Sequence, residues 1–170
     1  MQKKSAASAR KVTPGPGQES VWDYPRPPKV ETSRSKIRVE FRGKVIAETR
    51  RALRVLETSH PPVYYIPAED IRMEFLEREP GSSFCEWKGQ ALYYSVAVGD
   101  KIAGRAAWSY PKPSPAYSAI KDHVAFYAER MDACTVDGER VRPQEGAFYG
   151  GWITKNIVGP FKGAPGTLGW

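Results

Sequence analysis

Residues 84–98 read FCEWKGQALYYSVAV, and residues 101–111 read KIAGRAAWSYP after the pair Gly99-Asp100. A Gly-Asp pair between two runs of apolar and aromatic residues is typical of a tight hairpin turn. We therefore expect strands over residues 90–97 and 101–108, preceded by another over 83–87. Because neighbouring side chains of a strand point to opposite faces, this hairpin places aromatic rings on both faces of its sheet.

The rest of the chain also predicts short strands. Apolar and charged residues alternate with period two over 37–41, Arg42-Gly43 forms a turn, and 44–48 returns as a second strand. The same criteria predict strands at 52–56, 63–66, 72–76 and 124–126, a turn at 79–82, a single helical turn at 67–71, and a hairpin over 135–141 turning at Asp137-Gly138. Many short strands with almost no helix predict an all-β fold, either a β-rich barrel or a tent-like sandwich.

Proline, glycine and charge divide the chain into four segments. Residues 1–20 carry Pro-Gly-Pro-Gly and no apolar periodicity, so we expect a disordered basic tail. Residues 21–36 form a proline-rich arm whose Trp22 and Tyr24 need a surface to rest on. Residues 37–145 form the β domain, and residues 146–170 form a C-terminal arm rich in glycine and tryptophan.

The charge of the chain is concentrated at its start. The formal net charge is +7, and residues 1–38 hold nine basic and three acidic residues, a local net of +6. The remaining residues are almost neutral, whereas nucleic-acid-binding modules carry a basic patch on their folded part. We therefore expect nucleic-acid contact only as a weak, salt-sensitive attraction through the tail.

Cysteine usage and hydropathy indicate the compartment. Two cysteines, Cys85 and Cys134, do not make a disulfide framework, and free thiols are typical of a reducing compartment. No apolar run approaches the ~18 residues of a membrane span, and no apolar stretch follows the basic N-terminus as in a secretory signal. The sequence predicts a cytoplasmic protein without membrane contact.

Cys85 is the candidate nucleophile of the chain. A nucleophilic thiol needs a neighbouring cation or imidazole; Lys88 lies three residues away, and His60 and His123 are the only histidines. A Cys–His–acid arrangement would use Asp70 or Asp122 as the acid. Of the two histidines we favour His123 as functional, because it lies in a polar Lys-Asp-His patch and histidine changes charge near neutral pH. The alternative is that Cys85 is a small buried apolar residue and that both histidines bind backbone carbonyls.

The sequence predicts neither a metal nor a cofactor. The soft ligands are Cys85, Cys134, His60 and His123, and their spacing contains no Cys-x-x-Cys knuckle of the kind that holds structural zinc. No glycine-rich cradle precedes Lys88-Gly89, so this pair is not a phosphate-binding loop.

Aromatic residues with a few polar groups among them are typical of pockets for small molecules. In such a pocket Lys88 would meet an anionic or carbonyl group of the ligand. The alternative is an ordinary β core with cross-strand aromatic pairs and a solvated turn lysine. The candidate ligand-binding residues are His60, Tyr65, Trp87, Lys88, Tyr93, Trp108 and Tyr110.

Several of these stretches occur together in one known family. With residues 20–28, 56–67, 93–96, 106–111 and 123–126 and the Cys-x-Trp-Lys-Gly motif at 85–89, the chain resembles the domain-of-unknown-function family DUF427 over roughly residues 36–138. Glu86 replaces the proline expected in that motif. The resemblance implies a small β-rich domain without an established activity. A nucleotidyltransferase label attached to the family finds no support here, because no Asp-x-Asp pair follows a Gly-Ser turn to hold Mg²⁺.

Three functions are compatible with these observations. The first is a pocket for an unknown small molecule, binding or enzymatic, in which Cys85 or His123 performs any chemistry. The second is a non-catalytic module that uses the aromatic arms to bind a protein partner or to form a homo-oligomer. The third is nucleic-acid binding through residues 1–38, which the nearly neutral domain makes the least favoured.

Overall fold

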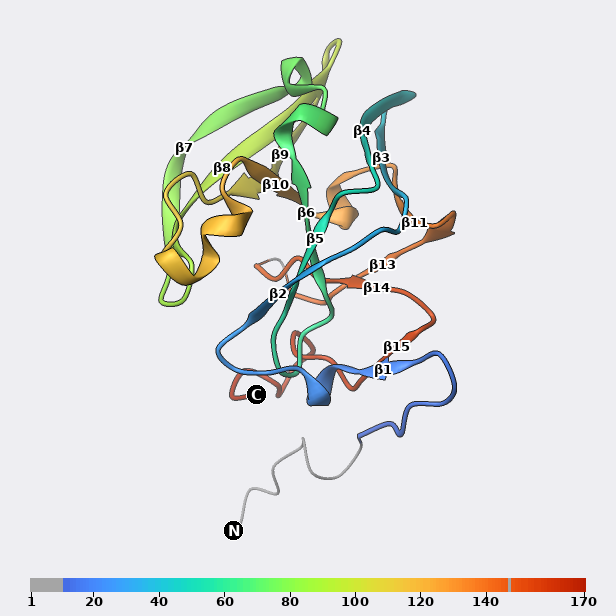
Figure 1. The fold of residues 1–170 in the computed structure, drawn as a ribbon. Helices are drawn as coiled ribbons and strands as arrows, with labels where there is room; N and C mark the ends of the chain where they lie inside the picture. Colours follow the sequence, from blue (N-terminus) through green and yellow to red (C-terminus); the bar gives the residue numbers. More distant parts are fainter. Residues whose placement is uncertain (1–10, 147) are drawn as a thin grey trace.

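A computed structural model describes residues 11–146 and 148–170, and its regular secondary structure consists of strands and short 3₁₀ helices (Figure 1). The short 3₁₀ helices are η1 (Val21–Asp23), η2 (Ala68–Asp70), η3 (Met73–Phe75), η4 (Pro115–Ile120) and η5 (Ala128–Arg130). Among these residues no helix is long and apolar enough to cross a membrane. The strands are β1 (Glu19–Ser20), β2 (Lys29–Thr32), β3 (Ile37–Phe41), β4 (Lys44–Thr49), β5 (Leu53–Leu56), β6 (Val63–Pro67), β7 (Leu76–Cys85), β8 (Gly89–Val98), β9 (Lys101–Ser109), β10 (His123–Phe126), β11 (Ala133–Val136), β12 (Glu139–Arg140), β13 (Arg142–Pro143), β14 (Trp152–Ile153) and β15 (Ile157–Val158).

Two antiparallel sheets carry the architecture. One has seven strands in the order β2-β5-β6-β10-β9-β8-β7, and the other has four in the order β12-β11-β3-β4. The larger sheet ends at the edge strands β2 and β7, so the strands described here do not close into a barrel. The all-β prediction is therefore confirmed, in the form of packed open sheets.

The seven-stranded sheet is buried on both faces. One face packs against β3 and β4 and forms the main core with Tyr64, Val96, Ala107, Val124 and Phe126. The opposite face carries Tyr65, Tyr93, Trp108, Ala125 and Tyr127 in a second apolar cluster. Adjacent residues such as Tyr64 and Tyr65 thus belong to different clusters, because neighbouring side chains of a strand point to opposite faces of the sheet.

The predicted hairpin turns form where glycine permits them. The β3–β4 turn has Arg42 at φ 48° and Gly43 at φ 77°, and the β11–β12 turn has Asp137 at φ 49° and Gly138 at φ 83°. Positive φ at both central residues is the geometry of two-residue hairpins whose twist matches that of the strands. These turns fix the register of both hairpins.

Two local predictions were wrong. Residues 72–76 were expected to form a strand, but the chain makes the 3₁₀ helix η3, in which Phe75 N–H donates to Arg72 O at 3.1 Å. The expected turn at 79–82 is instead a bulge inside β7, between the pairs Arg78–Tyr94 and Ser82–Leu92. Pro80 is tolerated there because β7 is an edge strand, where a missing N–H leaves no ladder bond unmade.

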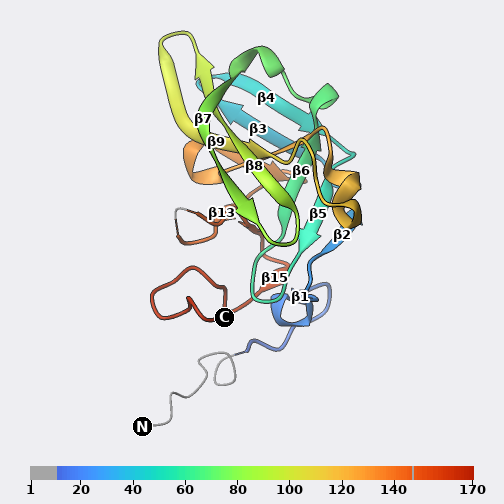
Figure 2. The same ribbon diagram turned by 90° about the vertical axis from the view of Figure 1, so that its left-hand side faces the viewer.

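The two arms pack against each other at the end of the molecule opposite the β3–β4 hairpin (Figure 2). As expected, the N-terminal arm docks: Val21 and Tyr24 are buried with Leu56 and Ile157. Trp22 Nε1 donates to Pro160 O at 2.9 Å.

The tail differs from the expected disorder where the structure describes it. Of residues 1–20, the first ten lie outside the described residues. In the rest, Val12 N–H donates to Gly159 O at 3.0 Å, and β1 pairs in parallel with β15. The sequence pattern missed this because the pairing partner lies more than a hundred residues further along the chain.

The C-terminal arm also enters the main core, through Trp152. This side chain is 1% exposed, its ring stacks on Tyr64 with centroids 5.2 Å apart, and its Nε1 donates to Phe126 O at 3.0 Å. The arm is therefore part of the folded domain.

Replacing Trp152 tests this integration. We expect Trp152→Ala to lower the free energy of unfolding by about 3–5 kcal/mol, because it removes a fully buried ring and leaves a cavity. The matched control in the same arm is Leu168→Ala, which removes an 83% exposed side chain and should cost less than ~0.5 kcal/mol. Urea unfolding measures both, and equal small losses would contradict the assignment of the arm to the core.

Candidate functional site

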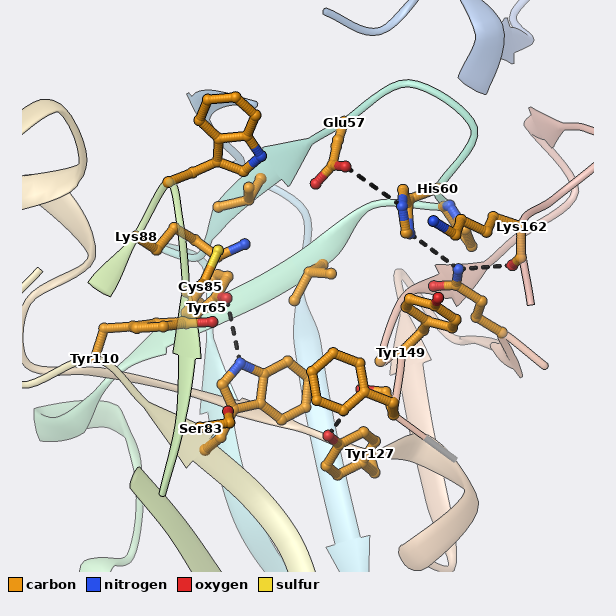
Figure 3. Close-up of a pocket in the computed structure, with 18 of the residues that line it drawn as sticks. Glu57, His60, Tyr65, Ser83, Cys85, Lys88, Tyr110, Tyr127, Tyr149 and Lys162 are labelled. Atoms are coloured by element: carbon orange, nitrogen blue, oxygen red, sulfur yellow. Dashed lines mark hydrogen bonds and ion pairs between the residues drawn. The ribbon is translucent and has the colours of Figure 1, made fainter. Parts of the chain in front are cut away.

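A cavity of about 260 Å³ opens on the face of the seven-stranded sheet that faces away from β3 and β4 (Figure 3). Its walls come from the β5–β6 loop, the β7–β8 turn, β9 and the C-terminal arm. The structure brings together eight of the nine candidate site residues in its lining: His60, Tyr65, Cys85, Trp87, Lys88, Tyr93, Trp108 and Tyr110.

Aromatic side chains from neighbouring strands form the floor. Trp108 Nε1 donates to the Tyr65 hydroxyl at 3.3 Å, and the Trp108 ring lies 4.5 Å from the ring of Tyr127. Burial raises the pKa of Tyr65 and, with a smaller contribution from its neighbours, the pKa of Tyr110. These hydroxyls therefore stay neutral at physiological pH and can exchange hydrogen bonds without adding charge.

The backbone around Lys88 is held firmly. Lys88 lies in the turn between β7 and β8 that the pair Cys85–Gly89 closes, and its carbonyl accepts from Ser114 N–H at 3.0 Å. Gly89 has φ 106°, which a residue with a Cβ rarely adopts. This turn directs the Lys88 ammonium to the wall shared with Cys85, Tyr65 and Tyr110 (Figure 3).

The Lys88 ammonium has no anionic partner in the described chain. Burial alone would lower the pKa of Lys88, but Tyr65, Cys85 and Glu57 outweigh that effect and the pKa is raised. Among the described residues, no carboxylate lies within 4.0 Å of Nζ and no side-chain hydrogen bond reaches it, while the Tyr110 ring centroid is 5.6 Å away. A shielded cation without a counter-ion is costly, so a bound anion would stabilise it.

A fixed polar group occupies the facing wall. Gln144 Oε1 accepts from Gly151 N–H at 3.1 Å, and its Nε2 donates to Lys162 O at 2.8 Å. These two bonds fix the orientation of the amide, so the remaining Nε2 proton is donated to His60 Nδ1, 3.1 Å away. The neutral His60 imidazole must then carry its own proton on Nε2.

His60 is uncharged at neutral pH. Burial lowers its pKa to about 4, and Glu57 only partly opposes this effect. The Nε2 atom lies 3.5 Å from Glu57 Oε2. His60 thus faces the cavity as a hydrogen-bond donor and not as a base, because its one unprotonated nitrogen is occupied by Gln144.

The structure does not bring His123 to this cavity, which corrects the expected grouping. β10 begins at His123, which is paired with Pro67 at the end of the strand, and its Nδ1 lies 2.7 Å from Lys121 O. Cys85 does line the cavity, but among the described residues neither imidazole lies within hydrogen-bond distance of its thiol. Catalytic roles for Cys85 and His123 stay predictions.

The four soft ligands are also spread apart. Cys134 lies in the main core on the other side of the sheet from Cys85, and burial raises the pKa of its thiol. Within the described ranges, no group of three or more histidine, cysteine, aspartate or glutamate side chains is placed to hold a metal ion.

Sequence reasoning missed more than half of the residues that line the cavity. The missed residues include Glu57, Ser83, Tyr127, Gln144, Tyr149 and Lys162. One signal was available in Gly150-Gly151, because adjacent glycines mark places where backbone approaches another group closely. A Cβ at Gly150 would overlap the Trp108 ring, and one at Gly151 would lie 2.6 Å from Pro61 O.

Comparison with known families identifies the domain. Residues 29–137 match the sequence profile of the family described as "Domain of unknown function (DUF427)". The chain belongs to this family, which confirms the resemblance seen in its motifs. No curated protein matches the sequence. The matched segment contains His60 and Lys88, whereas Gln144, Tyr149 and Lys162 follow it, so the cavity joins family-matched and flanking residues.

The pKa of His60 makes stability pH-dependent. The pKa of His60 is about 4 in the folded state and about 6.5 in the unfolded state. The contribution of neutral His60 to the free energy of unfolding is therefore complete above pH 6.5 and is lost as the pH falls towards 4. We expect the difference in unfolding free energy between wild type and His60→Gln to shrink by about 2–3 kcal/mol from pH 7 to pH 4.5. Urea unfolding at both pH values measures it. A difference independent of pH would show that His60 titrates normally.

Gly150 tests the contact that closes the cavity. We expect Gly150→Ala to displace Trp108 and to lower the unfolding free energy by about 1–3 kcal/mol, because the methyl group overlaps the indole ring. Gly169→Ala is the matched control, since nothing lies within 4 Å of a Cβ at that position. Thermal or urea unfolding compares the two variants, and equal stability would rule out the close approach.

Proposed function

We propose that this member of the DUF427 family binds a small planar molecule carrying an anionic or carbonyl group, with the aromatic part of the ligand on the Trp108 floor and its polar group at Lys88. The observation that supports this most directly is the Lys88 ammonium, which lies in an aromatic cavity and has no carboxylate within 4.0 Å among residues 11–146 and 148–170. The cytoplasmic location expected from the two free cysteines belongs to the same proposal.

The size of the cavity supports a compact ligand. Its volume of about 260 Å³ lies just below the range typical of small-molecule sites, ~300–1,000 Å³, so it suits one or two fused rings. Rings bound beside Trp108 and Tyr110 would gain offset or edge-to-face contacts, worth roughly 0.5–1.5 kcal/mol per aromatic pair beyond their burial.

The charge state of Lys88 supports ionic recognition. A lysine that forms a Schiff base needs a lowered pKa so that the free amine is available, whereas the pKa of Lys88 is raised. The side chain therefore offers a charged donor, and a charge-assisted hydrogen bond contributes about 1.5–3 kcal/mol.

Two observations favour binding over the other functions. Cys85 has no imidazole beside it in the described residues, so the cavity lacks the pair that a Cys–His nucleophile uses. The arms bury Val21, Tyr24 and Trp152 against their own domain, which leaves less aromatic surface for the interaction-module alternative.

The test uses two matched probes, 2-naphthoate and the uncharged 2-naphthamide. We expect wild type to bind 2-naphthoate about tenfold more tightly than 2-naphthamide, and Lys88→Met to weaken 2-naphthoate binding by about tenfold or more, because the ion pair is lost. Isothermal titration calorimetry measures the affinities.

Lys112→Met is the control, since Lys112 is exposed on the loop beside the Lys88 turn and does not line the cavity. This variant should bind both probes as wild type does. Absence of 2-naphthoate binding to wild type, or unchanged binding to Lys88→Met, would contradict the proposed function.

A further inference from the structure

The wall that faces Lys88 holds a carboxylate with an uncommitted oxygen. Glu57 Oε2 lies 3.3 Å from Arg26 Nη2 and 3.5 Å from His60 Nε2. In the described part of the chain no hydrogen bond is made to Glu57 Oε1, although the side chain is largely shielded and lines the cavity. An acceptor of this kind, next to an aromatic cavity, is available to a donor on a ligand.

A hydrogen-bond donor lies directly beside this acceptor. Gln144 occupies His60 Nδ1, so the imidazole proton is on Nε2, and its distance of 3.5 Å to Glu57 Oε2 exceeds the ~2.7–3.2 Å of a normal N–H···O bond. The Nε2–H group is therefore only weakly satisfied by the protein. Gln144 acts as a positioning residue, because it decides which imidazole nitrogen faces Glu57.

The other cation on this wall is already engaged. Lys162 Nζ lies 3.4 Å from Trp170 O and 5.6 Å from the centroid of the Tyr149 ring. Glu57 itself would repel a second anion at this position. The acidic end of a ligand is thus directed to Lys88, and the facing wall suits an uncharged group that both donates and accepts.

We propose that the cavity selects hydroxy-substituted aromatic acids, with the acid at Lys88 and the hydroxyl donating to Glu57 while it accepts from His60 Nε2–H. A hydroxyl satisfies both groups with one atom, whereas an ether oxygen can only accept and a bare ring edge satisfies neither. This inference rests on the proposed function of the cavity and adds the substituent that the second wall recognises.

The experiment compares 2-naphthoate with its 5-, 6- and 7-hydroxy derivatives and with the methyl ether of the isomer that binds best. We expect wild type to bind at least one hydroxy isomer more tightly, by about tenfold or more, than both 2-naphthoate and that methyl ether, as one added hydrogen bond to a carboxylate predicts. Glu57→Met should abolish this preference while it still binds 2-naphthoate.

Glu86→Met is the matched control, because Glu86 is another carboxylate of the lining but is exposed, and it should keep the preference. Retention of 2-naphthoate binding by Glu57→Met shows that the variant is folded. This inference would be overturned if wild type bound all the naphthoates equally, or if Glu57→Met kept the preference for the hydroxy isomer. Neither result would affect the proposed function, which requires only that 2-naphthoate binding depends on Lys88. Loss of that dependence would instead overturn the proposed function.

Discussion

Side-chain alternation in the seven-stranded sheet is the constraint on which the rest of the structure depends. Tyr64 and Phe126 fill the main core, while their neighbours Tyr65 and Tyr127 point to the cavity. A slip of one residue in the register would exchange the two sets, so the pairing that stabilises the core also determines the chemistry of the cavity. Most of the aromatic floor is therefore carried by strands of this sheet, with Tyr127 directly after β10.

Two partly buried cations of this protein, Arg54 and Lys88, differ in whether a carboxylate pairs with them. The Arg54 side chain is only 12% exposed, and it is paired with Glu19 at 2.7 Å and with Glu31 at 2.6 Å. Lys88 is also partly shielded, yet the described chain supplies no carboxylate of its own next to Nζ. Arg54 is thus paired with two carboxylates of the described chain, whereas Lys88 has none beside it and lies in an aromatic cavity. This difference favours an anionic ligand as the partner of Lys88.

The sequence predicted the framework better than the site. Turn glycines and period-two alternation located the hairpins of β3–β4, β8–β9 and β11–β12, because both signals are local. The density of aromatics around Lys88 located one wall of the cavity for the same reason. The other wall depends on Gln144, which contacts His60, and on Lys162, whose carbonyl holds Gln144; both residues follow the strands of the two sheets in the chain. The Gly150-Gly151 pair marks a close approach in this segment, but it does not indicate which residues are approached. His123 was misplaced because a polar patch in the sequence does not reveal which end of a strand reaches the cavity.

A crystal structure of the protein with 2-naphthoate would test the central claim most directly. The account predicts that the ring lies on Trp108 and that a carboxylate oxygen lies within hydrogen-bond distance of Lys88 Nζ, about 2.7–3.2 Å. A cavity that stays empty at saturating ligand, or a ligand whose carboxylate binds away from Lys88, would contradict it.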